Sequence, residues 1–232
     1  ARSEAALAGE TLRAVRPELV TIQQAQGAAE ALAGGLDTAA AEACGPLLDR
    51  LVAGSRTFLF AGVYGADGEG LCLSDAAPAS LAATGGHASV LTEAAPAMAV
   101  AAMPAGGSVM AALHPRSDEG GIVTGFAAVA PRILPRDGMG AATGGFVLIL
   151  FGRQGQIIDS TAAPQAGGAG EGAGQGIAAL LPEGRSLDSL QAADVATFSA
   201  LSVGGDRRAY SLVRLIEGEL YALGTWPVDS SG

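Results

Sequence analysis

The sequence contains no lysine, and all 13 of its basic residues are arginine. This absence excludes chemistry that depends on a lysine side chain, such as the phosphate-binding lysine of a P-loop, a Schiff base or a lysine general base. The formal net charge of −10 also argues against nucleic acids as partners, because their phosphate backbones bind to basic surfaces. We therefore expect an acidic surface that does not contact nucleic acid.

Aromatic residues are also scarce, since they make up 4% of a chain that is 49% hydrophobic. The core is therefore expected to consist mainly of small aliphatic side chains. No apolar run reaches the length of about 18 residues that a transmembrane helix needs. The chain of 232 residues is long enough for one large domain or two small ones, each with its own core.

Histidine and cysteine occur twice each, as His87, His114, Cys44 and Cys72. The histidines lack the spacing of two metal ligands on one helix, and two cysteines are too few for a zinc site, so we expect no metal. The cysteines have two interpretations. They can join a helix to a strand as a disulfide in an oxidising compartment, or remain buried free thiols, which is the interpretation that we favour.

Motifs for catalysis or cofactor binding are missing as well. No Gly-x-Ser-x-Gly elbow occurs around any serine. The glycine-rich run at 167–176 does not fit the G-x-G-x-x-G pattern in any frame, so a loop is a better interpretation than a nucleotide site. We expect no catalytic residues and no cofactor.

The first 55 residues or so hold the only long stretch of helical periodicity in the sequence. Gly34 and Gly35 are expected to bend this helix, and Pro17 argues against an unbroken one because an interior proline removes a hydrogen bond. The prediction is an N-terminal spine helix over 1–55, bent near 34–35, that forms half of a homodimer interface. Its apolar stripe begins with Leu7, Leu12, Val15, Leu19 and Ile22, which recur at steps of three to five.

Strand patterns follow the helix in two series with the same order. Each series starts with two strands joined by a tight glycine turn, continues with a helical or loop connection, and ends with three more strands. Gly68 and Gly155 occupy equivalent turns, and the Pro- and Gly-rich segment 131–145 separates the two series. The expected strands are 58–64, 71–74, 97–103, 108–113 and 122–130 in the first series, and 146–151, 156–160, 196–203, 209–216 and 220–228 in the second.

This repetition predicts an α+β fold with two modules behind the N-terminal helix. Each module would be a five-stranded antiparallel sheet, with short helices between its second and third strands. The expected modules cover 56–135 and 136–229, and the boundary between them falls within 131–145.

Three segments carry a resemblance to a known family: FLFAGVYGADGEGLCLS, FVLILFGRQGQIIDS and AYSLVRLIEGELYALGTWPV. They resemble the PAS-like modules of extracytoplasmic sensors. A long helix followed by two such modules is similar to the double Cache arrangement of bacterial chemoreceptors, sensor histidine kinases and diguanylate cyclases. The Ala-rich, lysine-free composition is most similar to that of alphaproteobacterial sensor kinases.

The resemblance implies a function. The chain would be the non-enzymatic, periplasmic portion of an inner-membrane sensor histidine kinase, with 56–135 distal and 136–229 proximal to the membrane. It would detect a small-molecule ligand, a periplasmic partner protein or an envelope signal and transmit it across the membrane. The alternatives are the sensor domain of a chemoreceptor or diguanylate cyclase, and a stand-alone periplasmic binding or interaction protein.

The resemblance also places a ligand pocket between each sheet and the segment that links its second and third strands. The residues that hold amino acids in some family members have no counterparts here, because 122–130 lacks an acidic residue and 78–93 lacks arginine and tryptophan. Polar side chains near the expected pocket rims are the remaining candidates for ligand binding. They are Tyr64, Asp75, His114 and Arg116 in the first module, and Arg208, Tyr210 and Tyr221 in the second.

Overall fold

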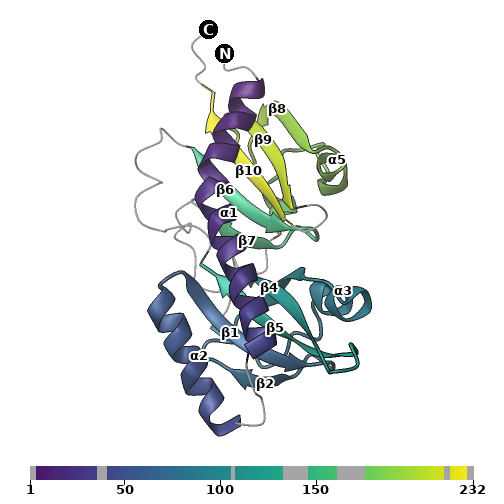
Figure 1. Ribbon diagram of the computed structural model, residues 1–232. Helices are drawn as coiled ribbons and strands as arrows, with labels where there is room; N and C mark the ends of the chain where they lie inside the picture. Colours follow the sequence, from purple (N-terminus) through teal and green to yellow (C-terminus); the bar gives the residue numbers. More distant parts are fainter. Residues whose placement is uncertain are drawn as a thin grey trace. The chain divides into compact units, whose positions relative to one another are not determined.

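The computed structural model consists of an N-terminal helix followed by two five-stranded antiparallel sheets with short helices, which confirms the α+β fold of two PAS-like modules (Figure 1). It describes residues 4–35, 41–105, 108–132, 146–160, 176–216 and 220–228. The elements are α1 (Glu4–Gly35), α2 (Ala41–Ser55), β1 (Phe58–Gly65), β2 (Gly70–Leu73), α3 (Gly85–Glu93), β3 (Ala97–Ala102), β4 (Ser108–Ser117), β5 (Val123–Pro131), β6 (Val147–Gly152), β7 (Ile157–Ser160), the 3₁₀ helix η3 (Ile177–Leu180), α5 (Leu187–Gln191), β8 (Val195–Leu201), β9 (Arg207–Ile216) and β10 (Leu220–Pro227).

The chain forms two compact units. One comprises Glu18–Ile133, and we call it the β1–β5 unit after its strands. The other combines Ala1–Pro17 with Leu134–Gly232, and we call it the β6–β10 unit. The expected module boundary falls largely on 133–145, which lies outside the described residues. No helix in the described part of the chain combines the length and the apolarity that are needed to cross a membrane.

The two sheets have the same topology. The strand order is β2-β1-β5-β4-β3 in the first sheet and β7-β6-β10-β9-β8 in the second, and all neighbouring strands are antiparallel. In both sheets the second and third strands along the chain lie at opposite edges. The connection between them therefore crosses a face of the sheet, and it carries α3 in one unit and η3 and α5 in the other.

The first hairpin turn has the same geometry in both units. Gly68 and Gly155 adopt φ angles of +81° and +80°, in the left-handed region that favours glycine. The carbonyl oxygen of each glycine accepts a hydrogen bond from the crossing connection, at 2.9 Å from the N–H of Leu81 and at 2.6 Å from the N–H of Ile177. These matching contacts show that the sequence repeat is also a structural repeat.

Side chains alternate between the two faces of the β1–β5 sheet. Phe60, Tyr64 and Phe126 lie on one face and pack with Val90 of α3 in a buried cluster. The helix α2 packs on β1 and β2, where its Leu48 is fully buried. Both faces are therefore covered, as the largely apolar strands of this sheet require.

Cys44 of α2 and Cys72 of β2 form a disulfide, with their Cα atoms 5.9 Å apart. The interpretation of the two cysteines as free thiols is therefore wrong. The number and spacing of the cysteines did not decide between a thiol pair and a disulfide, because the packing of α2 along β2 is a tertiary contact. Disulfides persist in oxidising compartments and are rare in the cytosol.

The helix α1 continues through Pro17, which we had expected to argue against a continuous helix. Side chains on both sides of the proline are buried, and this packing outweighs the one hydrogen bond that a proline removes. The apolar stripe also differs from the expected one, since Thr11 and Glu18 are buried whereas Leu12 is 44% exposed. Successive residues of a helix are rotated by about 100° around its axis. Because Thr11 is on the buried side, Leu12 therefore points away from the sheet.

The strand β4 is longer than expected, because it does not end at Leu113 but continues through Pro115 to Ser117. At Pro115, β4 pairs with β5 on one side. On its other side β3 pairs with β4 only as far as Leu113, so no strand lies beside Pro115 there in the described structure. A proline lacks a backbone donor and is tolerated where a strand has an unpaired edge.

Short helices lie between the second and third strands of both sheets, as expected. Gly85 and Gly86 form the first residues of α3. Ser186 caps α5 by accepting a hydrogen bond at 3.2 Å from the N–H of the third residue of the helix. The predicted bend at 34–35 lies at the end of α1 and borders 36–40, which lie outside the described residues.

Candidate ligand-binding site

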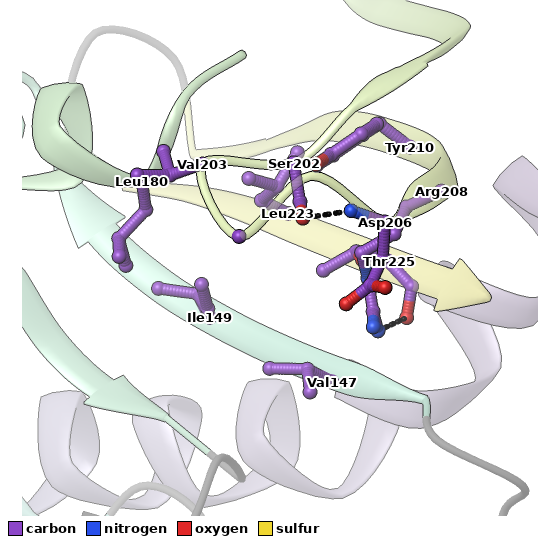
Figure 2. Close-up of a pocket in the computed structure, with 11 residues that line it drawn as sticks. Val147, Ile149, Leu180, Ser202, Val203, Asp206, Arg208, Tyr210, Leu223 and Thr225 are labelled. Atoms are coloured by element: carbon purple, nitrogen blue, oxygen red, sulfur yellow. Dashed lines mark hydrogen bonds between the residues drawn. The ribbon is translucent and has the colours of Figure 1, made fainter. Parts of the chain in front are cut away.

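A pocket of about 310 Å³ lies on one face of the β6–β10 sheet (Figure 2). Strand pairing places Val147, Ile149 and Leu223 on this face, and these three side chains form an apolar floor. Ile149 and Leu223 are almost completely buried, at 5% and 1% exposed. The pocket therefore offers an apolar ligand surface that is already shielded from water at its base.

Arg208 supplies a cation to the pocket from β9. Its Nε donates to the Thr225 hydroxyl at 2.5 Å, and its Nη2 donates to the Thr225 carbonyl oxygen at 3.5 Å. These bonds link neighbouring strands, since β9 pairs with β10 along this stretch. The guanidinium is half-buried and held in position before any ligand arrives.

Tyr210 lies two positions further along β9, on the same face as Arg208. Its ring stacks on Phe198 of β8, with the two ring centroids 5.0 Å apart. The guanidinium carbon of Arg185 lies over the Phe198 ring, 4.5 Å from the ring centroid. Burial raises the pKa of the Tyr210 phenol, and the nearby positive charge of Arg208 partly opposes this shift. The phenol therefore keeps its proton at neutral pH and can act as a hydrogen-bond donor.

The loop between β8 and β9 forms the rim of the pocket. Ser202 and Asp206 close this loop through a backbone hydrogen bond of 2.7 Å, and the Ser202 hydroxyl accepts a second bond from the Asp206 N–H at 3.2 Å. Gly205 has a φ of +87°, which the tight turn requires. The rim carries one exposed carboxylate, from Asp206, and one exposed apolar side chain, from Val203.

The structure brings together two of the three candidates from the second module. Arg208 and Tyr210 both line the pocket (Figure 2). Tyr221 lies on the same sheet face but is buried in the core, where its ring stacks on Phe151 at 5.5 Å. Ligand binding by these residues stays a prediction, and Tyr221 would act through packing rather than through a contact at the pocket surface.

The four candidates from the first module are not brought together. Tyr64 is fully buried, its hydroxyl donates to the Pro78 carbonyl oxygen at 2.9 Å, and it fills the space between sheet and connection. Asp75 is exposed on the loop after β2. His114 and Arg116 lie on the opposite sheet face from Tyr64, as the strand register requires.

Arg116 provides direct support for that placement. Its Nε donates to the carbonyl oxygen of Ala33 in α1, at 3.3 Å. The side chain therefore points to the sheet face on which α1 lies, and away from the face on which α3 lies. A ligand between the β1–β5 sheet and α3 would not reach it.

Several pocket residues were not among the candidates. Thr225, Ser202 and Asp206 contribute polar atoms, and Thr225 positions Arg208. A signal for Thr225 was present in the sequence, since Tyr221, Leu223 and Thr225 alternate along one strand and therefore share a face. The loop residues gave no comparable signal, because a loop has no fixed side-chain period.

Comparison with known proteins gives matches only among solved structures. No family model matches the sequence, and no curated protein matches it. An extracellular ligand-binding receptor from Desulfohalobium retbaense DSM5692 aligns with a TM-score of 0.61 and 14% identity, over 96% of this chain and 40% of that one. The extracellular domain of rpHK1S-Z16, which is assigned as a histidine kinase, aligns with a TM-score of 0.57 and 12% identity, over 99% of this chain and 94% of that one.

A chemoreceptor domain aligns equally well. The ligand-binding domain of the amino acid chemoreceptor PctB from Pseudomonas aeruginosa PAO1, in complex with L-Arg, has a TM-score of 0.56 and 16% identity, over 95% of this chain and 90% of that one. The chain has the fold of extracellular and periplasmic sensor domains. At these identities the likeness establishes the fold, while ligand and output have to be argued from the chain itself.

Proposed function

We propose that this chain is the periplasmic sensing portion of an inner-membrane sensor histidine kinase with the double Cache arrangement, of the alphaproteobacterial type. The observation that carries the proposal is the pocket of the β6–β10 unit, in which a positioned arginine faces an apolar floor. The Cys44–Cys72 disulfide supports an oxidising compartment. In this proposal the β1–β5 unit is distal and the β6–β10 unit proximal to the membrane, and the sensing portion is not itself an enzyme.

The mechanism would be a shift between two conformations of the receptor. A ligand that contacts β6, β10 and the β8–β9 loop at once favours the conformation in which these elements are closest to it. The ligand can shift the equilibrium only by its difference in affinity for the two conformations. The membrane-spanning helices of the full receptor would pass this shift to the kinase.

A chemoreceptor is the second candidate. The likeness to the chemoreceptor PctB matches the likeness to the kinase domain in TM-score and coverage. Both receptor types would use the same sensing step and differ in the output that follows the membrane. A diguanylate cyclase output and a stand-alone periplasmic binding protein are further alternatives.

The receptor proposal is tested with the full-length gene product in membrane vesicles. We expect apolar spans on both sides of this chain and a cytoplasmic kinase, and we expect compounds that raise the melting temperature of the 232-residue chain to change autophosphorylation in the vesicles. A methyl-accepting output domain would support the chemoreceptor instead. A gene product without membrane spans and without an output domain would contradict the receptor proposal.

The proposed receptor is a homodimer through its N-terminal helix. Leu12 of α1 is 44% exposed, so an apolar side chain is available at the helix surface. We expect the Leu12→Glu variant to weaken the dimer without affecting the fold, and Gln24→Glu, at an exposed position of the same helix, to have a smaller effect. Light scattering on the chain at high concentration measures this, and a monomeric wild type would count against the interface.

A further inference from the structure

The two units carry equivalent strands, so their inward-facing positions can be compared pair by pair. Tyr64 and Phe126 are cross-strand neighbours in the first sheet, and their stacked rings have centroids 5.3 Å apart. Phe151 and Tyr221 form the equivalent pair in the second sheet, with centroids 5.5 Å apart. Near the first hairpin turn, the two units are therefore filled in the same way.

Further from this turn the two units differ. Phe60 pairs with Ala130 in the β1–β5 unit, and both are completely buried core residues. The equivalent pair in the β6–β10 unit is Val147 and Thr225, which line the pocket. A phenylalanine ring fills the space in one unit, whereas the smaller valine leaves it open in the other.

The next strand shows the same contrast in polarity. Arg208 and Tyr210 of β9 line the pocket, while the equivalent residues of β4, by strand register, are Val109 and Ala111. Polar side chains cost stability on an inward sheet face unless they are hydrogen-bonded. Convergent polar groups above an apolar floor are typical of a small-molecule site. The β6–β10 unit thus has the features of a binding module, and the β1–β5 unit has a filled core.

The described polar side chains of the lining offer a ligand several hydrogen-bond donors. Arg208 has donors only, and the hydroxyl groups of Tyr210, Ser202 and Thr225 can each donate a proton. Asp206 is the one carboxylate among the described lining residues, and it lies at the exposed rim, where water weakens its repulsion of an anion. A donor-rich lining around a fixed cation favours a ligand head group that is anionic and accepts hydrogen bonds.

We propose that the pocket of the β6–β10 unit binds a small aliphatic monocarboxylate, with its carboxylate on Arg208 and its apolar chain against Ile149 and Leu223. A volume of about 310 Å³ is at the lower end for ligand pockets, so the ligand has a chain of only a few carbon atoms. The assignment rests on the proposed sensor function, because this ligand would be the signal that the receptor detects.

The test is isothermal titration calorimetry on the 232-residue chain with isocaproate as the probe. L-Leucine has the same carbon skeleton with an added α-amino group, and isohexanol has it without the carboxylate. We expect isocaproate to bind at least about 10-fold more tightly than either, because only its head group is a pure anion. Equal or tighter binding of leucine or isohexanol would overturn the proposal, as would no binding of isocaproate and of its shorter homologue isovalerate.

Two variants and one matched control locate the site. Arg208→Gln is expected to weaken isocaproate binding at least about 10-fold. Arg207→Gln makes the same chemical change at the adjacent, exposed residue, which does not line the pocket, and should leave binding unchanged. Val203→Asp places a carboxylate on the rim where the side chain is 71% exposed, so it should weaken binding without disturbing the fold. Unchanged binding in both Arg208→Gln and Val203→Asp would overturn the proposed site.

The same ligands separate this inference from the receptor function. If isocaproate binds but leaves autophosphorylation in vesicles unchanged, the site stands and the proposed function is contradicted. If isocaproate does not bind, while another compound changes autophosphorylation equally in the wild type and in Arg208→Gln, the function stands and the site is overturned.

Discussion

Replacing Tyr64 with alanine is expected to lower the free energy of unfolding of the β1–β5 unit by about 3–5 kcal/mol, the range for truncating a large buried aromatic residue. The side chain is completely buried, its ring stacks on Phe126, and its hydroxyl donates to the Pro78 carbonyl oxygen at 2.9 Å. The substitution therefore leaves a cavity and also an unsatisfied backbone acceptor.

The measurement uses the single tryptophan of the chain. Trp226 belongs to the β6–β10 unit, where its ring lies 4.8 Å from that of Phe146. In a urea titration of Tyr64→Ala, we expect circular dichroism to show an early transition that tryptophan fluorescence does not report. A variant whose two signals shift together by the same amount would contradict independent stability of the units.

The matched variant Tyr64→Phe separates the ring from the hydroxyl. It keeps the stacking and should cost only about 1 kcal/mol, the usual value of one hydrogen bond. Its stability should also depend less on pH. Burial raises the pKa of Tyr64 above the ordinary value of 10.0. In alkaline solution the folded chain therefore retains a phenol proton that the unfolded chain releases.

The sign of this pH effect follows from the direction of the shift. The stability that comes from the protonated phenol is fully present below about pH 10 and is lost as the pH rises above it. The difference between wild type and Tyr64→Phe should therefore shrink and reverse in strongly alkaline solution. Urea titrations at several pH values measure this difference. If the stability of the two proteins changed with pH in the same way, Tyr64 would ionise as easily in the folded state as in the unfolded state, and the prediction would be contradicted.

Removing the disulfide by Cys44→Ala together with Cys72→Ala is expected to destabilise the β1–β5 unit by about 3–4 kcal/mol. The two cysteines are 28 positions apart in sequence, and the estimate follows from the entropy that a crosslink of this length removes from the unfolded chain. A reducing agent should destabilise the wild type by a similar amount. Urea titrations monitored by circular dichroism give the comparison.

The double alanine variant is its own control for the reducing agent, which should not change its stability further. Tryptophan fluorescence should again be unaffected in both experiments, because Trp226 lies in the other unit. A wild type whose stability does not respond to reduction would show that the two thiols are not joined in solution. That result would also remove one support for an oxidising compartment.

Much of the fold could be predicted because its signals are local. Short apolar segments between glycine and proline turns identified the ten strands that the described residues form, and the equivalent turns at Gly68 and Gly155 revealed the repeat. The ends of the elements were less certain. The predicted strand 108–113 stops before Pro115, whereas β4 continues through this proline to Ser117. A proline interrupts a strand only where a neighbouring strand needs the backbone donor that it lacks, and β3 does not extend to Pro115.

The candidate site was harder to predict than the fold. Arg208 and Tyr210 share the pocket, but His114 and Arg116 point to the other face of their sheet. Strands with a clear polar–apolar alternation reveal their faces, whereas the alanine-rich strands of the first unit are apolar on both faces. No pattern in such a strand tells which side will meet a pocket.

By itself, the sequence determined the architecture of this protein: a long helix, two repeats of the same five strands, and a lysine-free acidic composition without a match to known catalytic motifs. Each of these properties depends on residues close together in the chain. The tertiary structure alone decided that Cys44 and Cys72 are joined, that Phe60 fills one unit, and that Thr225 positions Arg208 in the other. These contacts join residues from different elements, and packing and register, which no local pattern contains, bring them together.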